Sequence, residues 1–131
     1  SIMALGKIKA DTLEHSTAGS LDTQYVVNGS AKSHIRCELV GTAAIEGSLN
    51  IASLTDTATG KATPNFATSF SAATYSIASG GALNGDIIFT EHAANSVCVT
   101  GSFRIHTRTG DGNETLVDGD LLSAAIFGDL A

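Results

Sequence analysis

Three basic side chains alternate along one segment of this acidic chain and could bind an anion together. Arg104, His106 and Arg108 are each separated by one residue, and alternate residues of a strand project from the same face of a sheet. Guanidinium groups bind carboxylates and phosphates through charge-assisted hydrogen bonds. The spacing predicts a basic stripe that could bind acidic sugars or phosphates. The alternative is an ordinary solvated face whose cations pair with acidic residues such as Glu38 or Glu91. His34 and Arg36 form a second, shorter stripe.

Two acidic loops are the other candidates for chemistry, at residues 111–114 and 118–120. Oxygen-rich loops can hold Ca²⁺, but the ordered ligand positions of an EF-hand loop are missing here. Asp, Asn and Gly are also the residues that tight turns need. None of the four histidines stands at metal-ligand spacing from another histidine or a cysteine. We therefore expect turns at these loops, and neither a metal nor a cofactor.

Sequence motifs of the common enzyme classes are absent. The chain contains no HExxH, no GxSxG and no GxGxxG between a strand and a helix. Gly60-Lys61 is followed by Ala62, where a phosphate-binding loop would have Ser or Thr. We therefore expect a protein that is not an enzyme.

The composition is typical of a small, turn-rich β protein. The 131 residues include 14 glycines and one proline, and only 15% are charged, against about a quarter in typical soluble domains. The net charge of −6 disfavours nucleic acid as a partner, because such binding depends on Lys and Arg neutralising phosphates. The longest apolar run is far shorter than the roughly 18 residues of a membrane-spanning helix, so no membrane insertion is expected.

Short β-rich segments recur between turn signals and predict the fold class. Eight or nine of them indicate an all-β, antiparallel β-sandwich, jelly-roll-like, over residues 22–131. Residues 24–28 are expected to form its first strand and residues 96–108 its longest, with a break of that strand at Gly101 as the alternative. Residues 1–21 hold too few apolar side chains to bury a face and are predicted to form an extended N-terminal arm. The arm's candidate assembly residues are Ile8, Leu13 and Leu21.

The two cysteines are predicted to lie on different faces of their strands. Cys37 alternates with Ile35 and Leu39, which places it in the core. Cys98 has the opposite parity to Phe103 and Ile105, which places it outside. A disulfide between them is therefore not expected.

The segment Leu121–Phe127 is apolar at both even and odd positions. A strand is the favoured interpretation, and a short helix capped by Asp120 and ended by Gly128 is the alternative. In a strand, one face would pack on the core and the other would need cover, for which a neighbouring subunit is the obvious source. The residues predicted to lie at this subunit interface are Leu121, Leu122, Ala124, Ile126 and Phe127.

The polar lead-in at residues 10–32, ADTLEHSTAGSLDTQYVVNGSAK, resembles that of small virion proteins and terminal tail-fibre domains of tailed bacteriophages. YVVNGSAK at residues 25–32 matches the family phrase almost throughout, and GSLNIASLTD at residues 47–56 is similar to a second family segment. Residues 80–117 match weakly. Ser33-His34 stand where the family often has an aromatic pair that includes Trp.

The resemblance implies a structural and binding protein of the virion rather than a catalyst. We expect a homotrimer that contacts other virion proteins and contributes to host-surface attachment, with a bacterial surface glycan as a candidate ligand. The alternative is a capsid decoration protein that stabilises the phage head through residues 8–21. A soluble carbohydrate-binding module is disfavoured because the chain has no Trp and only two Tyr, and sugar faces usually stack on aromatic rings.

Overall fold

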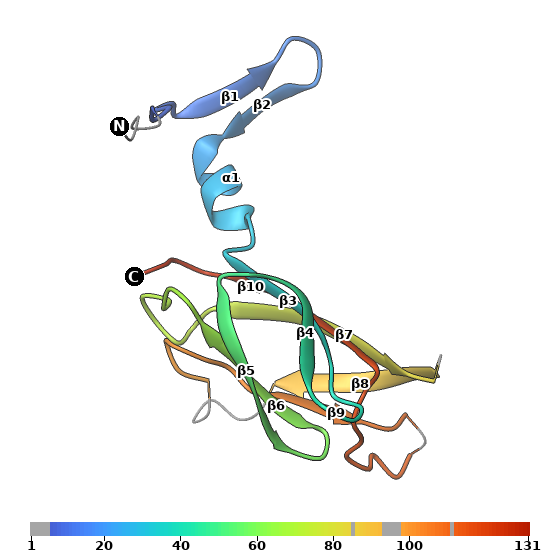
Figure 1. The fold of residues 1–131 in the computed structure, drawn as a ribbon. Coiled ribbons are helices and arrows are strands. Elements are labelled where there is room, and N and C mark those ends of the chain that lie inside the picture. Colours follow the sequence, from blue (N-terminus) through green and yellow to red (C-terminus); the bar gives the residue numbers. More distant parts are fainter. Residues whose placement is uncertain (1–5, 85, 93–97, 111) are drawn as a thin grey trace. The chain divides into compact units, whose positions relative to one another are not determined.

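The computed structural model describes residues 6–84, 86–92, 98–110 and 112–131, with the backbone alone at 86–92. The chain divides into two compact units, Ser1–Ser30 and Ala31–Ala131, each of which is described here by itself (Figure 1). The structure thus divides the chain after Ser30, whereas the sequence predicted an arm that ends at residue 21.

The N-terminal unit consists of a β-hairpin followed by a short helix. Strands β1 (Thr12–His15) and β2 (Gly19–Asp22) pair antiparallel with Leu13 opposite Leu21, and α1 spans Thr23–Gly29. The Nδ1 atom of His15 accepts the backbone N–H groups of Thr17 and Ala18 in the hairpin loop, at 3.2 and 3.0 Å. None of the described residues of this unit is buried, so the unit has no core of its own.

The strand predicted at residues 24–28 is wrong, because this segment is part of α1. Its β-branched valines favour a strand, but a strand needs a neighbour for its backbone hydrogen bonds, whereas a helix satisfies them within the segment. The Oγ of Ser30 donates to the carbonyl of Val26 at 2.5 Å and so satisfies one of the last-turn carbonyls. The first strand of the sandwich is instead β3 (Ser33–Glu38).

The second unit is an antiparallel β-sandwich, which confirms the predicted all-β class. Its strands follow the order β4-β3-β10-β7-β8-β9-β6-β5, and every pairing is antiparallel. The remaining strands are β4 (Ala44–Leu49), β5 (Ile51–Ala58), β6 (Lys61–Phe66), β7 (Ser76–Leu83), β8 (Asp86–His92), β9 (Ile105–Arg108) and β10 (Leu121–Phe127).

Strand β8 joins the two layers of the sandwich. Its first residues pair with β7, from Leu83 opposite Asp86 to Gly81 opposite Ile88. Its last residues pair with β9, from Phe89 opposite Arg108 to His92 opposite Ile105. One layer is therefore β4-β3-β10-β7, the other is β9-β6-β5, and β8 passes from one to the other (Figure 1).

The core is one cluster to which both layers contribute. β3 and β10 bury every second side chain and β6 does the same from the other layer, as expected for strands with one face on a core. Phe66 on β6 contacts three aromatic rings, with centroids at 4.8 Å for Phe70, 5.6 Å for Tyr75 and 5.5 Å for Phe103. The buried cluster comprises Ile35, Cys37, Leu39, Ala62, Phe66, Phe70, Cys98, Phe103, Ile105, Leu122, Ala124 and Ile126.

The predicted strand at Leu121–Phe127 is confirmed as β10, which lies between β3 and β7. The interface predicted from this segment needs correction. Leu122, Ala124 and Ile126 are buried in the chain's own core and are closed to a partner, because a strand sends alternate side chains to opposite faces. Leu121 and Phe127 have the other parity and are partly exposed.

The prediction for Cys37 is confirmed and that for Cys98 is wrong, because both cysteines are buried. Neither forms a disulfide in the part of the chain that the structure describes. Val99 and Ser102 exchange backbone hydrogen bonds of 2.9 and 3.3 Å, which makes a tight turn around Gly101. The strand expected at 96–108 is therefore interrupted at Gly101, as the alternative had it, and its parity does not carry across the turn. Residues 93–97 lie outside the described residues.

Candidate functional site

The outer face of the β9-β6-β5 layer gathers cationic and hydroxyl side chains. Burial alternates strictly along β6 and from Phe103 to Arg108, so the predicted basic stripe does leave the sheet on the side away from the core. The register places Lys61 of β6 directly opposite His106. We call this surface the basic–hydroxyl face; its residues are Ser53, Thr55, Thr57, Lys61, Thr63, Asn65, Arg104, His106 and Arg108.

The cations of this face differ in how they are held. Arg108 donates from Nη1 to the backbone carbonyl of Glu114, at 3.1 Å. The Nε of Arg104 is shielded from solvent and has no hydrogen-bond partner among the described residues. Of the two acidic residues expected as neighbours, the structure places Glu91 opposite His106 in the β8–β9 register, whereas Glu38 ends β3 in the other layer.

The polar side chains of β5 and β6 form a ladder across the two strands. The Nδ2 of Asn65 donates to the Oγ of Ser53 at 3.0 Å and to the Oγ1 of Thr55 at 3.1 Å. The hydroxyls of Thr57 and Thr63 lie 3.3 Å apart. These contacts order a row of hydroxyl groups beside the basic stripe.

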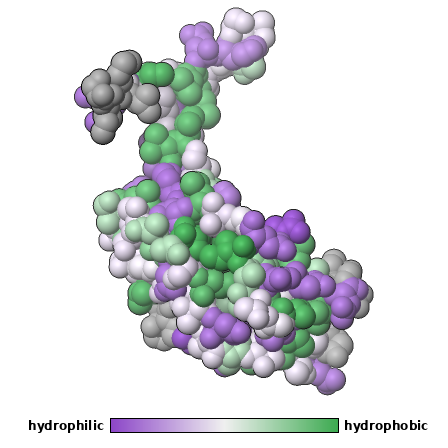
Figure 2. Space-filling model, in the orientation of Figure 1, coloured by the Kyte–Doolittle hydropathy of each residue, from purple (hydrophilic) through white to green (hydrophobic). Residues whose placement is uncertain are grey.

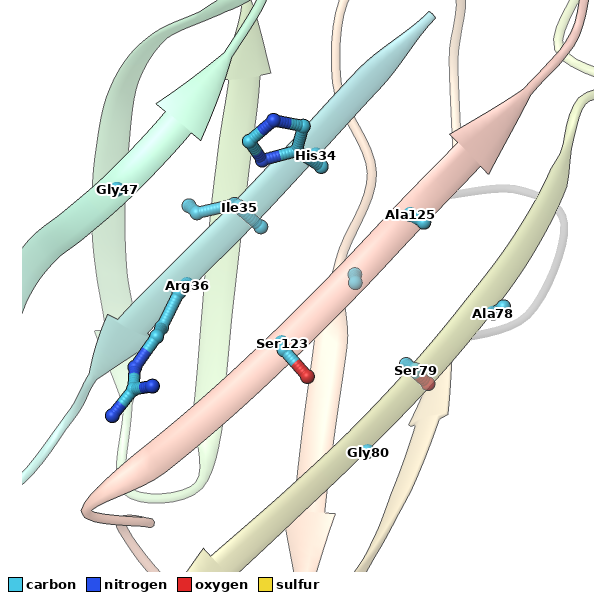
Figure 3. A pocket seen from close by; sticks show the side chains of 10 residues that line it. His34, Ile35, Arg36, Gly47, Ala78, Ser79, Gly80, Ser123 and Ala125 are labelled. Atoms are coloured by element: carbon cyan, nitrogen blue, oxygen red, sulfur yellow. The ribbon is translucent and has the colours of Figure 1, made fainter. Parts of the chain in front are cut away.

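The outer face of the other layer carries the second, shorter stripe and a shallow hollow of about 560 Å³. His34 and Arg36 project from β3, and the residues beside them on β10 and β7 are small (Figure 3). The register sets Ser123 between Arg36 and Gly80, and Ala125 between His34 and Ala78. Arg36 forms an ion pair with Glu46 of β4, with Nε 2.6 Å from Oε2. The hollow thus lies over the outer face of β10, which sequence reasoning expected to need cover.

The predicted arm residues are exposed in the N-terminal unit. Ile8 is 94% exposed, and about half of Leu13 and of Leu21 is open to solvent. Sequence reasoning missed two residues of α1, Tyr25 and Val27, because it assigned them to the sandwich; they are 61% and 58% exposed. Figure 2 shows hydrophobic side chains gathered along α1.

The carboxylates of the acidic loop at 118–120 accept hydrogen bonds from the backbone of two other turns. The Oδ1 of Asp118 accepts the backbone N–H of Gly60 at 2.7 Å, and the Oδ2 of Asp120 accepts that of Asn84 at 2.9 Å. Within the described ranges, no group of three or more His, Cys, Asp or Glu side chains could hold a metal ion. Asp111 of the other loop lies outside those ranges.

The buried Cys37 and the partly buried Tyr75 both have raised pKa values, so their nucleophilic anions form less readily. Burial, with a smaller contribution from the charge of Glu46, raises the pKa of Cys37 to about 11. The pKa of Tyr75 is also raised, chiefly by burial and further by Cys98. The Tyr75 hydroxyl donates to the carbonyls of Val99 and Ser102, at 3.0 and 2.8 Å. The Tyr75 hydroxyl thus holds the turn at residues 99–102.

None of the family models, curated proteins or solved structures compared with this chain matches it. The helix α1 has seven residues, and no helix in the described part of the chain is long and apolar enough to span a membrane. A functional proposal therefore depends on the chain's own residues and on the resemblance of its lead-in.

Proposed function

We propose that this protein is a structural protein of a tailed-phage virion. It acts as a fibre-type domain that assembles as a homotrimer and contributes to host-surface attachment. The observation that carries the proposal is the N-terminal unit, whose apolar side chains are exposed while the sandwich beside it in the chain has a complete core. The YVVNGSAK phrase at residues 25–32 supports the same assignment through its resemblance to phage fibre proteins.

The exposed apolar residues of the N-terminal unit favour self-association. A two-stranded hairpin is at best marginally stable in water, and a seven-residue helix is shorter than isolated helices require. Fully burying one aliphatic or aromatic side chain contributes roughly 1.5–3 kcal/mol, so half-exposed ones contribute roughly half of that. Leu13, Leu21, Tyr25 and Val27 together provide several kcal/mol per copy when copies pack against one another.

The outer face of β10 offers a second surface for a neighbouring copy. Leu121, Ala125 and Phe127 are partly exposed on a central strand, where an antiparallel sheet facing water would usually carry polar side chains. The small residues of β7 beside them leave the hollow shown in Figure 3. A second copy of the chain is the occupant that a homotrimer would supply.

Light scattering on the full chain tests the assembly. We expect a mass three times the 13.3 kDa of one chain at micromolar concentration. Tyr25→Ser with Val27→Ser should give monomers. Val40→Ser, which changes an equally apolar and 47% exposed residue of the sandwich, is the matched control and should remain trimeric. A monomeric wild-type chain would contradict the proposal.

Cell binding tests the attachment role. The labelled trimer should bind whole cells of at least one strain in a panel of bacteria and should leave purified phage heads unbound. The reverse result would favour the capsid decoration protein, for which the exposed N-terminal unit is also a suitable clamp.

A further inference from the structure

We propose that the basic–hydroxyl face binds an acidic polysaccharide through the carboxylate or phosphate groups and the hydroxyls of its sugars. This deepens the proposed host attachment, and it rests on that function only for the biological source of the glycan.

Positive charge is concentrated on this face of an otherwise acidic protein. Lys61, Arg104 and Arg108 are three of the seven Lys and Arg residues of the chain, and His106 lies among them. The net charge of −6 does not abolish the local attraction, since charges farther away than about 8 Å are largely screened at physiological ionic strength. A nearby anion therefore interacts mainly with the cations of this face.

Three acidic residues can be related to this face by a hydrogen bond or by the strand register. Asp118 is engaged with the backbone N–H of Gly60, and the backbone carbonyl of Glu114 accepts a hydrogen bond from Arg108. Glu91 lies opposite His106 in the backbone register of β8 and β9. Arg104 and Lys61 are therefore the cations on which the proposal depends most.

Arg104 is suited to hold an anion. It is partly buried, and among the residues that the structure describes its Nε has no hydrogen-bond partner. A guanidinium group presents several N–H donors in a planar fork that matches the geometry of carboxylate and phosphate. Partial burial strengthens such a pair, because water competes less for it.

The hydroxyl ladder beside the stripe is suited to the rest of the sugar. Sugar hydroxyls both donate and accept hydrogen bonds, as do the side chains of Ser53, Thr55 and Thr57. Asn65 and Thr63 already hold these three groups in a row. From residue 53 to residue 57 the row runs for roughly 13 Å along β5, so an extended ligand can make repeated contacts.

The chemistry of the face favours an acidic glycan over nucleic acid or a neutral sugar. Proteins that bind single-stranded nucleic acid stack its bases on aromatic rings, and neutral sugars usually stack on aromatic rings as well. The nine side chains of the basic–hydroxyl face include no Phe, Tyr or Trp, and their one aromatic ring is the imidazole of His106. Affinity at this face must therefore come from charge and hydrogen bonds, which an acidic polysaccharide satisfies.

Binding to purified polymers tests the proposal without cells. We would use affinity electrophoresis and calorimetry with polygalacturonate, poly(ribitol phosphate) and neutral dextran. We expect at least one acidic polymer to bind and dextran not to bind. Whether the carboxylate or the phosphate polymer binds better identifies the source of the anion. Raising the salt concentration to about 1 M should weaken binding, because the contacts are electrostatic.

Variants locate the binding on this face. Lys61→Gln with Arg104→Gln should lower the affinity at least tenfold, and Thr55→Val with Thr63→Val about threefold. Arg36→Gln removes a cation of the opposite layer and is the matched control, which should bind like the wild type. Equal losses in Arg36→Gln and in the double variant of Lys61 and Arg104, no binding of either acidic polymer, or equal binding of dextran would each overturn the proposal.

Failure of this site and failure of the attachment role give different results. If the Lys61 and Arg104 variant still binds cells as the wild type does, the glycan site is wrong and the attachment role stands. If the wild type binds an acidic polymer but no strain in the panel, the site stands and the attachment role is wrong.

Discussion

Substituting Gly60 by alanine should destabilise the sandwich far more than the change of one methyl group suggests. Gly60 lies between β5 and β6 with a φ of +67°. A Cβ there would lie 2.8 Å from the carbonyl oxygen of Thr107, 2.8 Å from the nitrogen of Val117 and 3.0 Å from the oxygen of Val117. All three are backbone atoms, so no side-chain rotation relieves the clash.

The backbone around Gly60 is also held from both sides. Its N–H donates to the Oδ1 of Asp118 at 2.7 Å, and its carbonyl accepts the N–H of Thr107 at 2.9 Å. The left-handed conformation costs a non-glycine residue about 1–2 kcal/mol, and overpacking typically costs about 1–3 kcal/mol. We expect Gly60→Ala to lower the free energy of unfolding by about 3 kcal/mol.

Gly41→Ala provides the matched control for this measurement. Gly41 has a φ of +71°, and a Cβ built on it meets no other atom within 4 Å. It should therefore show the conformational cost alone, about 1 kcal/mol. Urea denaturation followed by circular dichroism measures both variants. If Gly60→Ala unfolds at the same urea concentration as Gly41→Ala, then the backbone of Thr107 and Val117 does not obstruct a Cβ at residue 60, and the reasoning is refuted.

Three further predictions concern other parts of the molecule. Tyr75→Phe removes the hydroxyl that holds the turn at residues 99–102 and should cost about 1–2 kcal/mol, measured by the same denaturation; no loss would contradict this role. Burial raises the pKa of Cys37 from about 9 to about 11, so its contribution to the free energy of unfolding is fully present below about pH 9 and is lost as the pH rises towards 11. Cys37→Ala should flatten that decline. Deleting residues 1–30 should leave the melting temperature of the sandwich within a few degrees while abolishing trimers in light scattering, and an unfolded fragment would refute this.

Alternation in the sequence predicted much of the sandwich. Ile35 and Cys37 on β3, Phe103 and Ile105 before and within β9, and the strand at β10 follow from a period of two. The same period predicted that the side chains of the basic stripe share one face. These features are local, so the order of residues is enough to reveal them.

The features that sequence reasoning missed depend on contacts between distant residues. Residues 24–28 have strand-forming valines, but nothing in their local sequence reports the lack of a strand to pair with. The burial of Cys98 depends on a turn around Gly101. The sequence contains the glycine that signals this turn, and the turn shifts the parity of the residues before it. The tight fit around Gly60 depends on residues 107 and 117, about 50 positions along the chain.

The position of β10 in its layer has a consequence for synthesis of the chain. Among the described strands β10 leaves the ribosome last, yet it lies between β3 and β7 and supplies Leu122, Ala124 and Ile126 to the core. The hairpin of β5 and β6 can form early because its pairings are local. Until residue 127 emerges, however, β3 and β7 present unpaired edges, which are sites of aggregation in a nascent chain. This layer is complete only when β10, the last of the described strands to be synthesised, inserts between β3 and β7.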